Sequence, residues 1–334
     1  MQKRTLGTSD LELTVIGLGT WAIGGGDWAF GWGPQDDQES IDCIVRAVDL
    51  GVNWIDTAAV YGHGQSERLV GKAIGQIDPA QRPMIATKCG RTSLADGGIG
   101  KSLQRDSVIA ECEASLKRLG VDCIDLYQMH WPEPDEEIEE GWQTLVDLKK
   151  QGKVRHIGVS NHSVGQMERL QAIHPIASLQ PPYSMMAREV ETEILPYCGQ
   201  QNIGVIAYSP MGKGMLTGAF NADRVASLDD SDHRSRDPRF QAPQLQVNLD
   251  FVAQLSEIAS GLGWTLPEIA IAWVMRRPEL TAAIVGTRRP EQIEQTVVAG
   301  TRSLDDATIA AIDTLLKQRD DQLASLSGVQ QARV

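Results

Sequence analysis

Short runs of apolar, β-prone residues alternate with longer amphipathic runs over most of the chain, from about residue 15 to residue 300. Eight of the short runs are predicted to be strands: residues 15–20, 53–58, 84–88, 123–130, 154–161, 177–183, 204–210 and 282–287. The segments between them show helical periodicity, and several end in a glycine, as capped helices do. The clearest of these predicted helices are residues 40–51, 67–75, 107–120, 141–152 and 166–173. This alternation is typical of βα units around a parallel sheet.

Eight alternations favour a closed (β/α)8 barrel, the TIM-barrel architecture of the α/β class, over an open doubly wound sheet, which usually has fewer strands. Such barrels reach this length as one domain, so we predict a single barrel domain over residues 1–334. A small hairpin at residues 3–14 is predicted to plug the bottom of the barrel, and a last helix at about 304–322 leads into a polar tail at about 323–334. Residues 211–247 form a long insertion after the seventh strand, and loops of that length are usually functional or disordered.

The composition is that of a globular protein with a large core, because 42% of the residues are hydrophobic and 22% are charged. The formal net charge of −13 repels nucleic acids and anionic membrane surfaces, so we expect neither as a partner. The N-terminal segment has no apolar h-region, and no run approaches the roughly 18 apolar residues of a membrane span, which predicts a cytoplasmic location. The five cysteines form no C-x-x-C pair, so we expect no disulfide framework and no metal site.

Polar residues at the C-terminal ends of barrel strands indicate chemistry, since barrel active sites lie there. The second predicted strand ends at Asp56 and leads to Tyr61, the third ends at Lys88 and the fourth at His130. Any one of these side chains alone could be structural: a loop cap, a core phenol, a solvated lysine or a structural histidine. Because they follow three successive strands, we predict that they converge on one site.

Proton transfer to a substrate oxygen is the chemistry that these four groups suit. A phenol pKa near 10 is too high for efficient proton transfer at neutral pH, and a neighbouring ammonium lowers it. We therefore expect Lys88 to lower the pKa of Tyr61 and Asp56 to hold Lys88 in place. His130 could hydrogen-bond the substrate oxygen and complete the proton path.

The segments that carry these residues, DTAAVYGHGQSE, ATK and QMHWP, resemble the signatures of the aldo-keto reductase superfamily, in particular its bacterial general-stress-protein branch. The resemblance extends over nearly the whole chain through LGTSDLELTVIGLGTWAIGG, GKVRHIGVSN, LQPPYS, AYSPMGKGMLTG and IVGTRRPEQIEQ. It implies that Asp56, Tyr61, Lys88 and His130 are the catalytic tetrad, with Tyr61 as general acid for reduction and general base for oxidation. The implied reaction is NADPH-dependent reduction of aldehydes and ketones to alcohols by hydride transfer, without flavin or metal.

The resemblance also implies where NADP(H) lies. Ser160 and Asn161, assisted by Gln180, would hold the nicotinamide carboxamide, Tyr208 would stack on the ring, and the residues after the eighth strand would lie at the adenosine end. Thr296 stands there where many relatives have asparagine. The implied cofactor contacts are Thr20, Trp21, Asp56, Ser160, Asn161, Gln180, Tyr208, Ser209, Pro210, Met211, Gly212, Lys213, Arg234, Gly286, Thr287, Arg288, Gln292 and Thr296.

Two features of the chain fit the phosphates of such a cofactor. The segment 208–213 offers glycine-rich amides and a lysine, as phosphate-binding loops do, although a mobile surface turn would have the same composition. The guanidinium groups of Arg288 and Arg289 are suited to bind the 2′-phosphate that distinguishes NADP from NAD. The alternative is that both arginines only lie on a helix surface. Either Arg234 or Arg236 of the long insertion is a candidate to fold over the cofactor.

Four tryptophans in strand-end loops, Trp21, Trp28, Trp32 and Trp131, are predicted to wall an apolar substrate cleft, unless they are buried against the barrel rim. No basic residue is evidently placed for a substrate phosphate, which favours neutral aldehydes, dicarbonyls such as methylglyoxal, or sugars. The acidic run at 133–140 is expected only to lead into a helix N-terminus. The remaining histidines, mostly expected at the surface or in capping positions, are His63, His156, His162, His174 and His233.

Two other functions are compatible with the same fold. One is an NADP(H)-binding redox sensor or regulatory subunit with little turnover, and the other is a barrel lyase or isomerase without a redox cofactor. The intact tetrad favours the reductase. We therefore expect a small-molecule carbonyl compound as the partner, and a monomer or weak oligomer.

Overall fold

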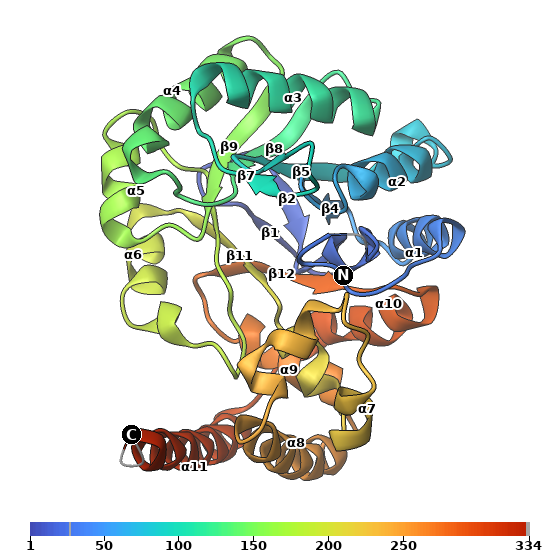
Figure 1. The fold of residues 1–334 in the computed structure, drawn as a ribbon, viewed down its shortest axis with the longest axis vertical. Coiled ribbons are helices and arrows are strands. Elements are labelled where there is room, and N and C mark those ends of the chain that lie inside the picture. The colour runs from blue at the N-terminus through green and yellow to red at the C-terminus, as the bar shows by residue number, and fades with distance from the viewer. Residues whose placement is uncertain (27, 332–334) are drawn as a thin grey trace.

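Figure 1 shows a barrel of strands surrounded by helices, in a computed structural model that describes residues 1–26 and 28–331. The eight parallel strands are β3 (Ile16–Gly19), β4 (Trp54–Asp56), β5 (Met84–Cys89), β8 (Ile124–Met129), β9 (Val154–Ser160), β10 (Ser178–Gln180), β11 (Gly204–Tyr208) and β12 (Leu280–Gly286). Each pairs with the next in chain order, and β12 closes the barrel on β3 by pairing Ala283 with Ile16. The (β/α)8 prediction is confirmed, and each strand overlaps a predicted one.

Helices lie between the strands and cover the outside of the barrel (Figure 1). They are α1 (Asp37–Asp49), α2 (Gln65–Ile74), α3 (Arg105–Leu119), α4 (Ile138–Lys150), α5 (Val164–Gln171), α6 (Ile194–Gln201), α9 (Leu266–Met275) and α10 (Pro290–Val297). Their ends follow local sequence signals: Ser163 and Gln166 form a capping box at the start of α5, and the left-handed Gly120 follows α3. Because helices cover the strands from outside, nearly all strand residues are buried.

The N-terminal hairpin closes the bottom of the barrel with strands β1 (Lys3–Thr5) and β2 (Glu12–Thr14). Its leucines, Leu6, Leu11 and Leu13, are buried. They pack with the barrel residues Trp54, Ala86, Leu126, Ile206, Ala282 and Ile284. The turn requires a glycine, since Gly7 has a φ of 52° and a Cβ atom there would lie 2.5 Å from the carbonyl oxygen of Ala177. The predicted plug is therefore confirmed.

The segment after β11 is more regular than the long loop that was predicted. Helix α8 (Gln244–Gly261) begins inside that segment. The shorter elements before it are η5 (Gly212–Thr217), α7 (Ala222–Ala226), η6 (His233–Arg236) and η7 (Pro238–Phe240). Elements this short leave no periodic signal in a sequence, which is why the pattern missed them.

The last helix, α11 (Asp306–Gln331), packs against α8 at one side of the molecule (Figure 1). It continues through most of the stretch predicted as a polar tail, and residues 332–334 of that tail lie outside the described residues. Within the described part of the chain, no single helix is long and apolar enough to cross a membrane. Only α8 and α9 taken together pass that test, as a pair bent by 89°.

A second hairpin follows β5 and was not predicted. Its strands, β6 (Thr92–Ser93) and β7 (Ile99–Gly100), pair antiparallel over the C-terminal side of the barrel, and we call it the mouth hairpin. The Nδ1 atom of His63 lies 2.7 Å from the Oγ atom of Ser93, which ties this hairpin to the loop that follows β4. The mouth hairpin therefore has a fixed place beside the candidate site.

Candidate active site

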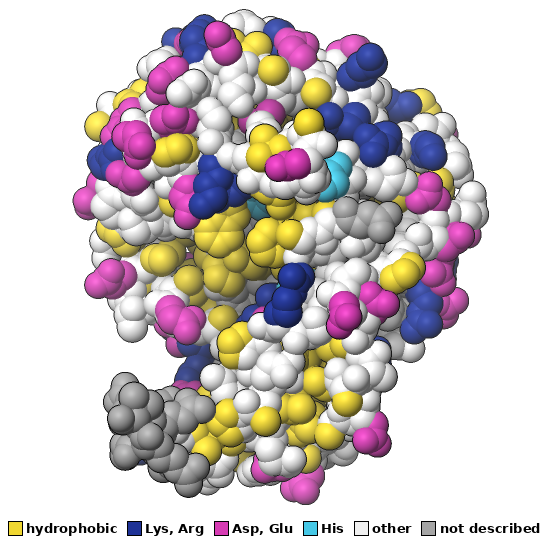
Figure 2. All heavy atoms as spheres, viewed as in Figure 1, with side chains coloured by type: hydrophobic (Ala, Val, Ile, Leu, Met, Phe, Trp, Pro, Cys, Tyr) yellow, Lys and Arg dark blue, Asp and Glu magenta, His cyan; other side chains and the backbone are white. Residues whose placement is uncertain are grey.

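The C-terminal ends of the strands open into a continuous cavity of about 1880 Å³. Figure 2 shows a hollow in this face of the molecule, lined mainly by hydrophobic side chains and bordered by Lys or Arg side chains. Nearly all of the residues predicted for the site line this cavity. Apart from Arg236, which was offered only as an alternative to Arg234, the predicted site residues that do not line it are Thr20, Lys88 and Gly212. These three are buried behind its wall.

The structure brings the four side chains of the predicted tetrad together at one end of the cavity. The ammonium of Lys88 donates to both carboxylate oxygens of Asp56, at 2.9 and 2.7 Å, and to the carbonyl oxygen of Thr57 at 2.8 Å. Its Nζ atom lies 3.4 Å from the hydroxyl of Tyr61. The ring of His130 stands edge-on to the ring of Tyr61, with 5.7 Å between their centroids. The neighbouring strands β4, β5 and β8 thus deliver these groups to one place.

The electrostatics of this pocket differ from the sequence expectation in one respect. We expected Lys88 to lower the pKa of Tyr61, but burial raises the pKa of this phenol well above its usual value, and the charge of Asp56 raises it further. The expectation was wrong chiefly because the fold buries the phenol, and also because Asp56 opposes the effect of the ammonium. Burial and the cations Lys88 and Arg91 hold the pKa of His130 well below its usual value. The resting pocket therefore holds a protonated phenol and a neutral imidazole.

The Asp56–Lys88 pair is shielded from solvent, with side-chain exposures of 4% and 0%. Burial alone raises the pKa of Asp56 and lowers that of Lys88, while their mutual attraction opposes both shifts. The amide of Gln180 also donates to Asp56, at 2.7 Å. These contacts satisfy a charge pair that would be costly to bury without partners.

Hydrogen bonds continue from the tetrad along the wall of the cavity. The hydroxyl of Ser160 donates to the carbonyl oxygen of Gln180 at 2.7 Å, and the amide of Asn161 donates to the carbonyl oxygen of His130 at 3.0 Å. The hydroxyl of Tyr208 donates to the Oδ1 atom of Asn161, also at 3.0 Å. The residues predicted to hold a nicotinamide ring are thus mutually fixed beside the tetrad.

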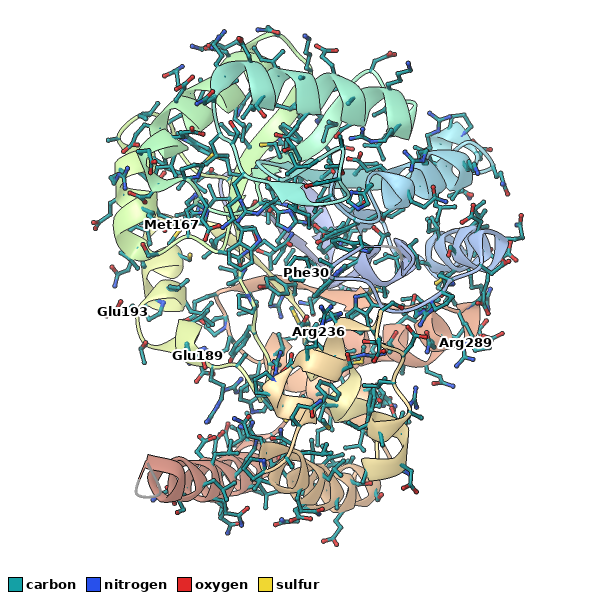
Figure 3. The ribbon with its side chains drawn as sticks, in the orientation of Figure 1. Phe30, Met167, Glu189, Glu193, Arg236 and Arg289 are labelled. Carbon is teal, nitrogen blue, oxygen red and sulfur yellow. The ribbon has the colours of Figure 1, made fainter. Side chains whose placement is uncertain are left out.

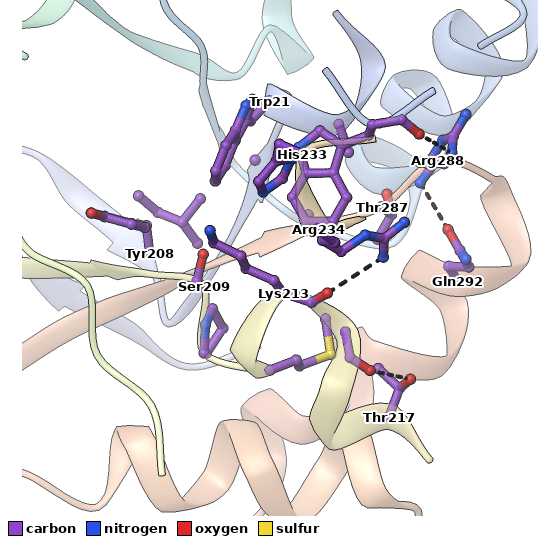
Figure 4. A pocket seen from close by; sticks show the side chains of 18 of the residues that line it. Trp21, Tyr208, Ser209, Lys213, Thr217, His233, Arg234, Thr287, Arg288 and Gln292 are labelled. Atoms are coloured by element: carbon purple, nitrogen blue, oxygen red, sulfur yellow. Dashed lines mark hydrogen bonds between the residues drawn. The ribbon is translucent and has the colours of Figure 1, made fainter. Parts of the chain in front are cut away.

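The turn after β11 has the backbone shape of an anion site. Ser209, Gly212, Lys213 and Gly214 all have left-handed φ values, between 56° and 94°. Turns of this shape can direct N–H groups towards an anion, although here the N–H groups of Gly212 and Gly214 donate to the carbonyl oxygens of Ser209 and Met211, at 2.9 and 3.1 Å. Lys213 reaches across the cavity towards Trp21 (Figure 4), and its ammonium lies 5.7 Å from the tryptophan ring centroid. The same ammonium donates to Asp237 at 2.9 Å, so a protein carboxylate already neutralises it.

The predicted arginines are also engaged with protein groups. Arg234 forms a two-pronged pair with Asp232 and lies over the ring of Trp32, 4.6 Å from its centroid. Arg288 donates to the Oε1 atom of Gln35 at 2.6 Å, to the carbonyl oxygen of Trp32 at 2.9 Å and to that of Pro34. The guanidinium of Arg288 therefore holds the loop before α1, and only some of its donors remain for a ligand.

The two remaining arginine candidates differ in position. Arg289 is exposed and lies towards the outside of the molecule, whereas Arg236 lies near Phe30 (Figure 3) and donates to the carbonyl oxygen of Ala29 at 2.9 Å. Thr296 is buried and bonds the carbonyl oxygen of its helix neighbour Gln292.

The four predicted tryptophans divide into two groups. Trp21 and Trp28 lie 6.3 and 6.0 Å from the ring of Tyr61, and Trp32 stands edge-on to Trp21 at 5.2 Å. Trp131 stands apart from this cluster and is 38% exposed. All four line the cavity, as the prediction of an aromatic cleft requires, and Trp28 is buried as well.

His233 belongs to the same cluster and was not predicted there. Its ring stacks on Trp21 at 4.8 Å and meets the edge of Trp32 at 4.7 Å. Burial lowers its pKa to about 4. The surface role expected for most of these histidines was wrong for His233, and also for the buried His162. No local signal in the sequence links residue 233 to residue 21.

The mouth hairpin contributes the other residues that the sequence did not reveal. Arg91 and Lys101 both line the cavity, and both bind the Oε2 atom of Glu133, at 2.7 and 2.8 Å. The sequence showed no basic residue evidently placed for a substrate phosphate, and the structure brings these two to the cavity, both paired with Glu133. Glu133 begins the acidic run to which we assigned no chemistry, and it too faces the cavity.

Comparison with known proteins agrees with this geometry. The sequence profile of the Aldo/keto reductase family matches residues 15–317. The chain belongs to this family. It is 38% identical to the aldo-keto reductase YhdN of Bacillus subtilis over 297 residues, which cover 88% of this chain and 87% of that protein.

Two further relatives of this aldo-keto reductase span nearly its whole length. The NADH-specific methylglyoxal reductase of Escherichia coli is 35% identical over 319 residues, covering 92% of this chain and 96% of the relative. The solved structure of a glycerol dehydrogenase from Gluconobacter oxydans superposes with a TM-score of 0.85 at 34% identity, covering 95% and 96% of the two chains. Family membership makes the protein an oxidoreductase that uses a nicotinamide cofactor and acts on carbonyl or alcohol groups.

Proposed function

We propose that this aldo-keto reductase reduces aldehydes and ketones to alcohols with NADPH, and that Tyr61 gives the proton to the carbonyl oxygen. The observation that carries the proposal is the buried phenol of Tyr61, which shares one pocket with the Asp56–Lys88 pair and the ring of His130. In this proposal residues 1–334 act as one catalytic domain, as a monomer or weak oligomer.

The bound NADPH would supply the hydride for the carbonyl carbon. As the carbonyl oxygen gains negative charge, the hydroxyl of Tyr61 gives up its proton to that oxygen. The phenolate that remains lies 3.4 Å from the ammonium of Lys88, which stabilises it at the moment when the charge forms. The neutral imidazole of His130 can donate one hydrogen bond to the same substrate oxygen. In alcohol oxidation the same groups act in reverse.

The residues along the cavity fit an extended dinucleotide. Ser160, Asn161 and Gln180 offer hydroxyl and amide groups beside the tetrad, where a carboxamide would bind. The left-handed turn at 209–214 suits a diphosphate. Arg288 lies at the adenosine end of the predicted site and would contact a 2′-phosphate, which is our reason to propose NADPH over NADH. One relative is named as NADH-specific, so titration with both cofactors is the test of this preference.

Turnover of 4-nitrobenzaldehyde by the purified protein, followed by the loss of NADPH absorbance, tests the reaction. We expect steady NADPH oxidation that requires the aldehyde. Tight NADPH binding without oxidation across a broad aldehyde panel would instead support a redox sensor. If NADPH titration changes no fluorescence at all, a lyase or isomerase becomes the better assignment.

A further inference from the structure

We propose that the cavity mouth beside His130 binds a carboxylate on the substrate, so that the preferred substrates are aldehydes with an acidic group some bonds away from the carbonyl. This inference rests on the reductase function proposed above. It adds the substrate class and the residues that select it: Arg91, Lys101 and Glu133.

Arg91 has a fixed position. Its side chain is only 10% exposed, and its guanidinium donates to the Oε2 atom of Glu133 at 2.7 Å and to the carbonyl oxygen of Gly90 at 3.1 Å. The guanidinium carbon lies 5.8 Å from the ring centroid of Trp131. A cation held in this way loses little side-chain freedom when it binds a ligand, which favours binding.

Lys101 brings a second cation to the same carboxylate oxygen. It follows the mouth hairpin, its side chain is 57% exposed, and its Nζ atom lies 2.8 Å from the Oε2 atom of Glu133. The other oxygen of Glu133 has no partner among the described residues. The Lys101 and Arg91 contacts hold the pKa of Glu133 below its usual value, so this carboxyl stays ionised. Two cations around one carboxylate leave an excess of one positive charge.

Among the described residues that line the cavity here, no other charge cancels that excess. The nearby Glu111, whose charge also acts on Arg91, does not line the cavity; it is buried and accepts the backbone N–H groups of Gly90 and Arg91. Asp56 is neutralised by Lys88 inside the pocket, and the neighbouring lining residues Trp28, Val60 and Ile99 are uncharged. The field of Arg91 extends to the tetrad, because it contributes to the low pKa of His130. Since the chain carries a net charge of −13, this local excess is what would attract an anionic substrate.

A purely structural role would explain only part of this arrangement. Arg91 and Glu133 alone would join the loops that follow β5 and β8. Lys101 is not needed for that link, and its half-exposed side chain turns an otherwise neutral ion pair into a cationic site at the cavity. The apolar side chains beside Tyr61 would then contact the uncharged part of the substrate.

The test compares 4-carboxybenzaldehyde with its methyl ester, which differ mainly in charge. We expect a kcat/KM for the carboxylate about tenfold above that for the ester at low ionic strength, as for one charge-assisted contact, and a smaller ratio in high salt. Lys101→Met should lower this ratio several-fold. Glu133→Gln should raise it, because it removes the competing carboxylate. Lys150→Met, at an exposed ion-paired lysine outside the cavity, is the matched control and should leave the ratio unchanged.

The outcomes separate the two proposals. If the ester is reduced but the ratio is near one, or if neither Lys101→Met nor Glu133→Gln changes it, the carboxylate site is wrong while the reductase function stands. If neither aldehyde is reduced by protein that binds NADPH, both proposals fail. Opposite shifts of the ratio in the two variants would support the site, since a general loss of folding cannot produce them.

Discussion

The two ends of the cavity neutralise their charges in different ways. At the tetrad end, Lys88 pairs with Asp56 from the neighbouring strand, and both side chains are almost fully buried. At the end formed by the segment between β11 and α8, which we call the loop end, Lys213 pairs with Asp237 and Arg234 with Asp232. The loop-end partners lie on turns and short helices instead of on paired strands.

This difference indicates at which end a ligand can replace the carboxylate that neutralises a cation. Lys88 and Asp56 project from two paired strands of the barrel, so the backbone that carries them is set before any ligand arrives. Asp232 and Asp237 lie outside the barrel strands, and if their segment moves on binding, the phosphates of a cofactor can take their places beside the same cations. We infer that the tetrad end is built for chemistry on a fixed frame, and the loop end for reversible capture of an anionic ligand.

Tyr61→Phe should distinguish most clearly between the proposed roles of the two ends, catalysis and cofactor binding. This change removes the proposed proton donor and leaves the loop end intact, so kcat should fall by about two to four orders of magnitude while the Kd for NADPH stays within about twofold. Steady-state kinetics and a fluorescence titration measure the two quantities. Tyr197→Phe on α6 is the matched control. Near wild-type kcat in Tyr61→Phe would exclude this phenol as the donor.

If the two ends differ in rigidity, replacing the lysine at each end should lower the free energy of unfolding by different amounts. Lys88→Met leaves the Asp56 carboxylate buried without its partner, and the free energy of unfolding should fall by about 3–5 kcal/mol. Lys213→Met should cost about 1 kcal/mol or less, because Asp237 keeps its second partner Arg239. Urea denaturation of both variants tests this. Equal losses would mean that the two ends are equally fixed.

Arg288→Ala tests the proposed preference for NADPH over NADH. Arg288 follows β12 and lies at the predicted adenosine end of the cavity. If Arg288 contacts a 2′-phosphate, NADPH affinity should fall by roughly 1–3 kcal/mol and NADH affinity should hardly change. Titration with each cofactor measures both values. Gln35→Ala is the control, because it removes a hydrogen-bond partner of Arg288 and leaves the charge. Equal losses for the two cofactors would show that Arg288 acts only by holding the 32–35 loop.

The last expected effect, a pH dependence of stability, concerns His233, whose ring packs between Trp21 and Trp32 beside the loop end. Its pKa is lowered to about 4 by burial and by Lys213, whereas an unfolded histidine titrates near 6.5. The stability that this group contributes is therefore present above about pH 6.5 and is lost as the pH falls towards 4. Between pH 7 and pH 5, the wild type should lose about 2 kcal/mol more than His233→Gln. If the free energies of unfolding of the wild type and of His233→Gln fall in parallel as the pH is lowered, this prediction is wrong.

The barrel and the convergence of the tetrad could be predicted because both follow from the order of elements along the chain. Once the strands alternate with helices, parallel pairing brings the ends of β4, β5 and β8 to one side, whatever the details of packing. The side chains of Asp56, Lys88 and His130 then meet without any further information. Their electrostatic state did not follow, because the pKa of Tyr61 depends on how deeply the folded chain buries it.

The mouth hairpin and the pairing of the loop-end cations could not be predicted for a different reason. Strands of two residues have no periodicity, and the contact between Arg91 and Glu133 joins loops that are 42 residues apart. The ring of His233 stacks on that of Trp21, although most of the barrel strands lie between these two residues in the sequence. Such contacts depend on how the loops pack on the folded barrel. Hydrophobic patterning predicts only the strands and helices of the barrel.

The closure of the barrel has a consequence for how the protein is made. Strand β3 near the N-terminus pairs with β12, and the guanidinium of Arg4 in β1 donates to the carbonyl oxygen of Leu280 at 2.6 Å. A ribosome releases β3 long before β12. The seam at which the cylinder closes must therefore stay open, with apolar edges unpaired, until β12 has emerged.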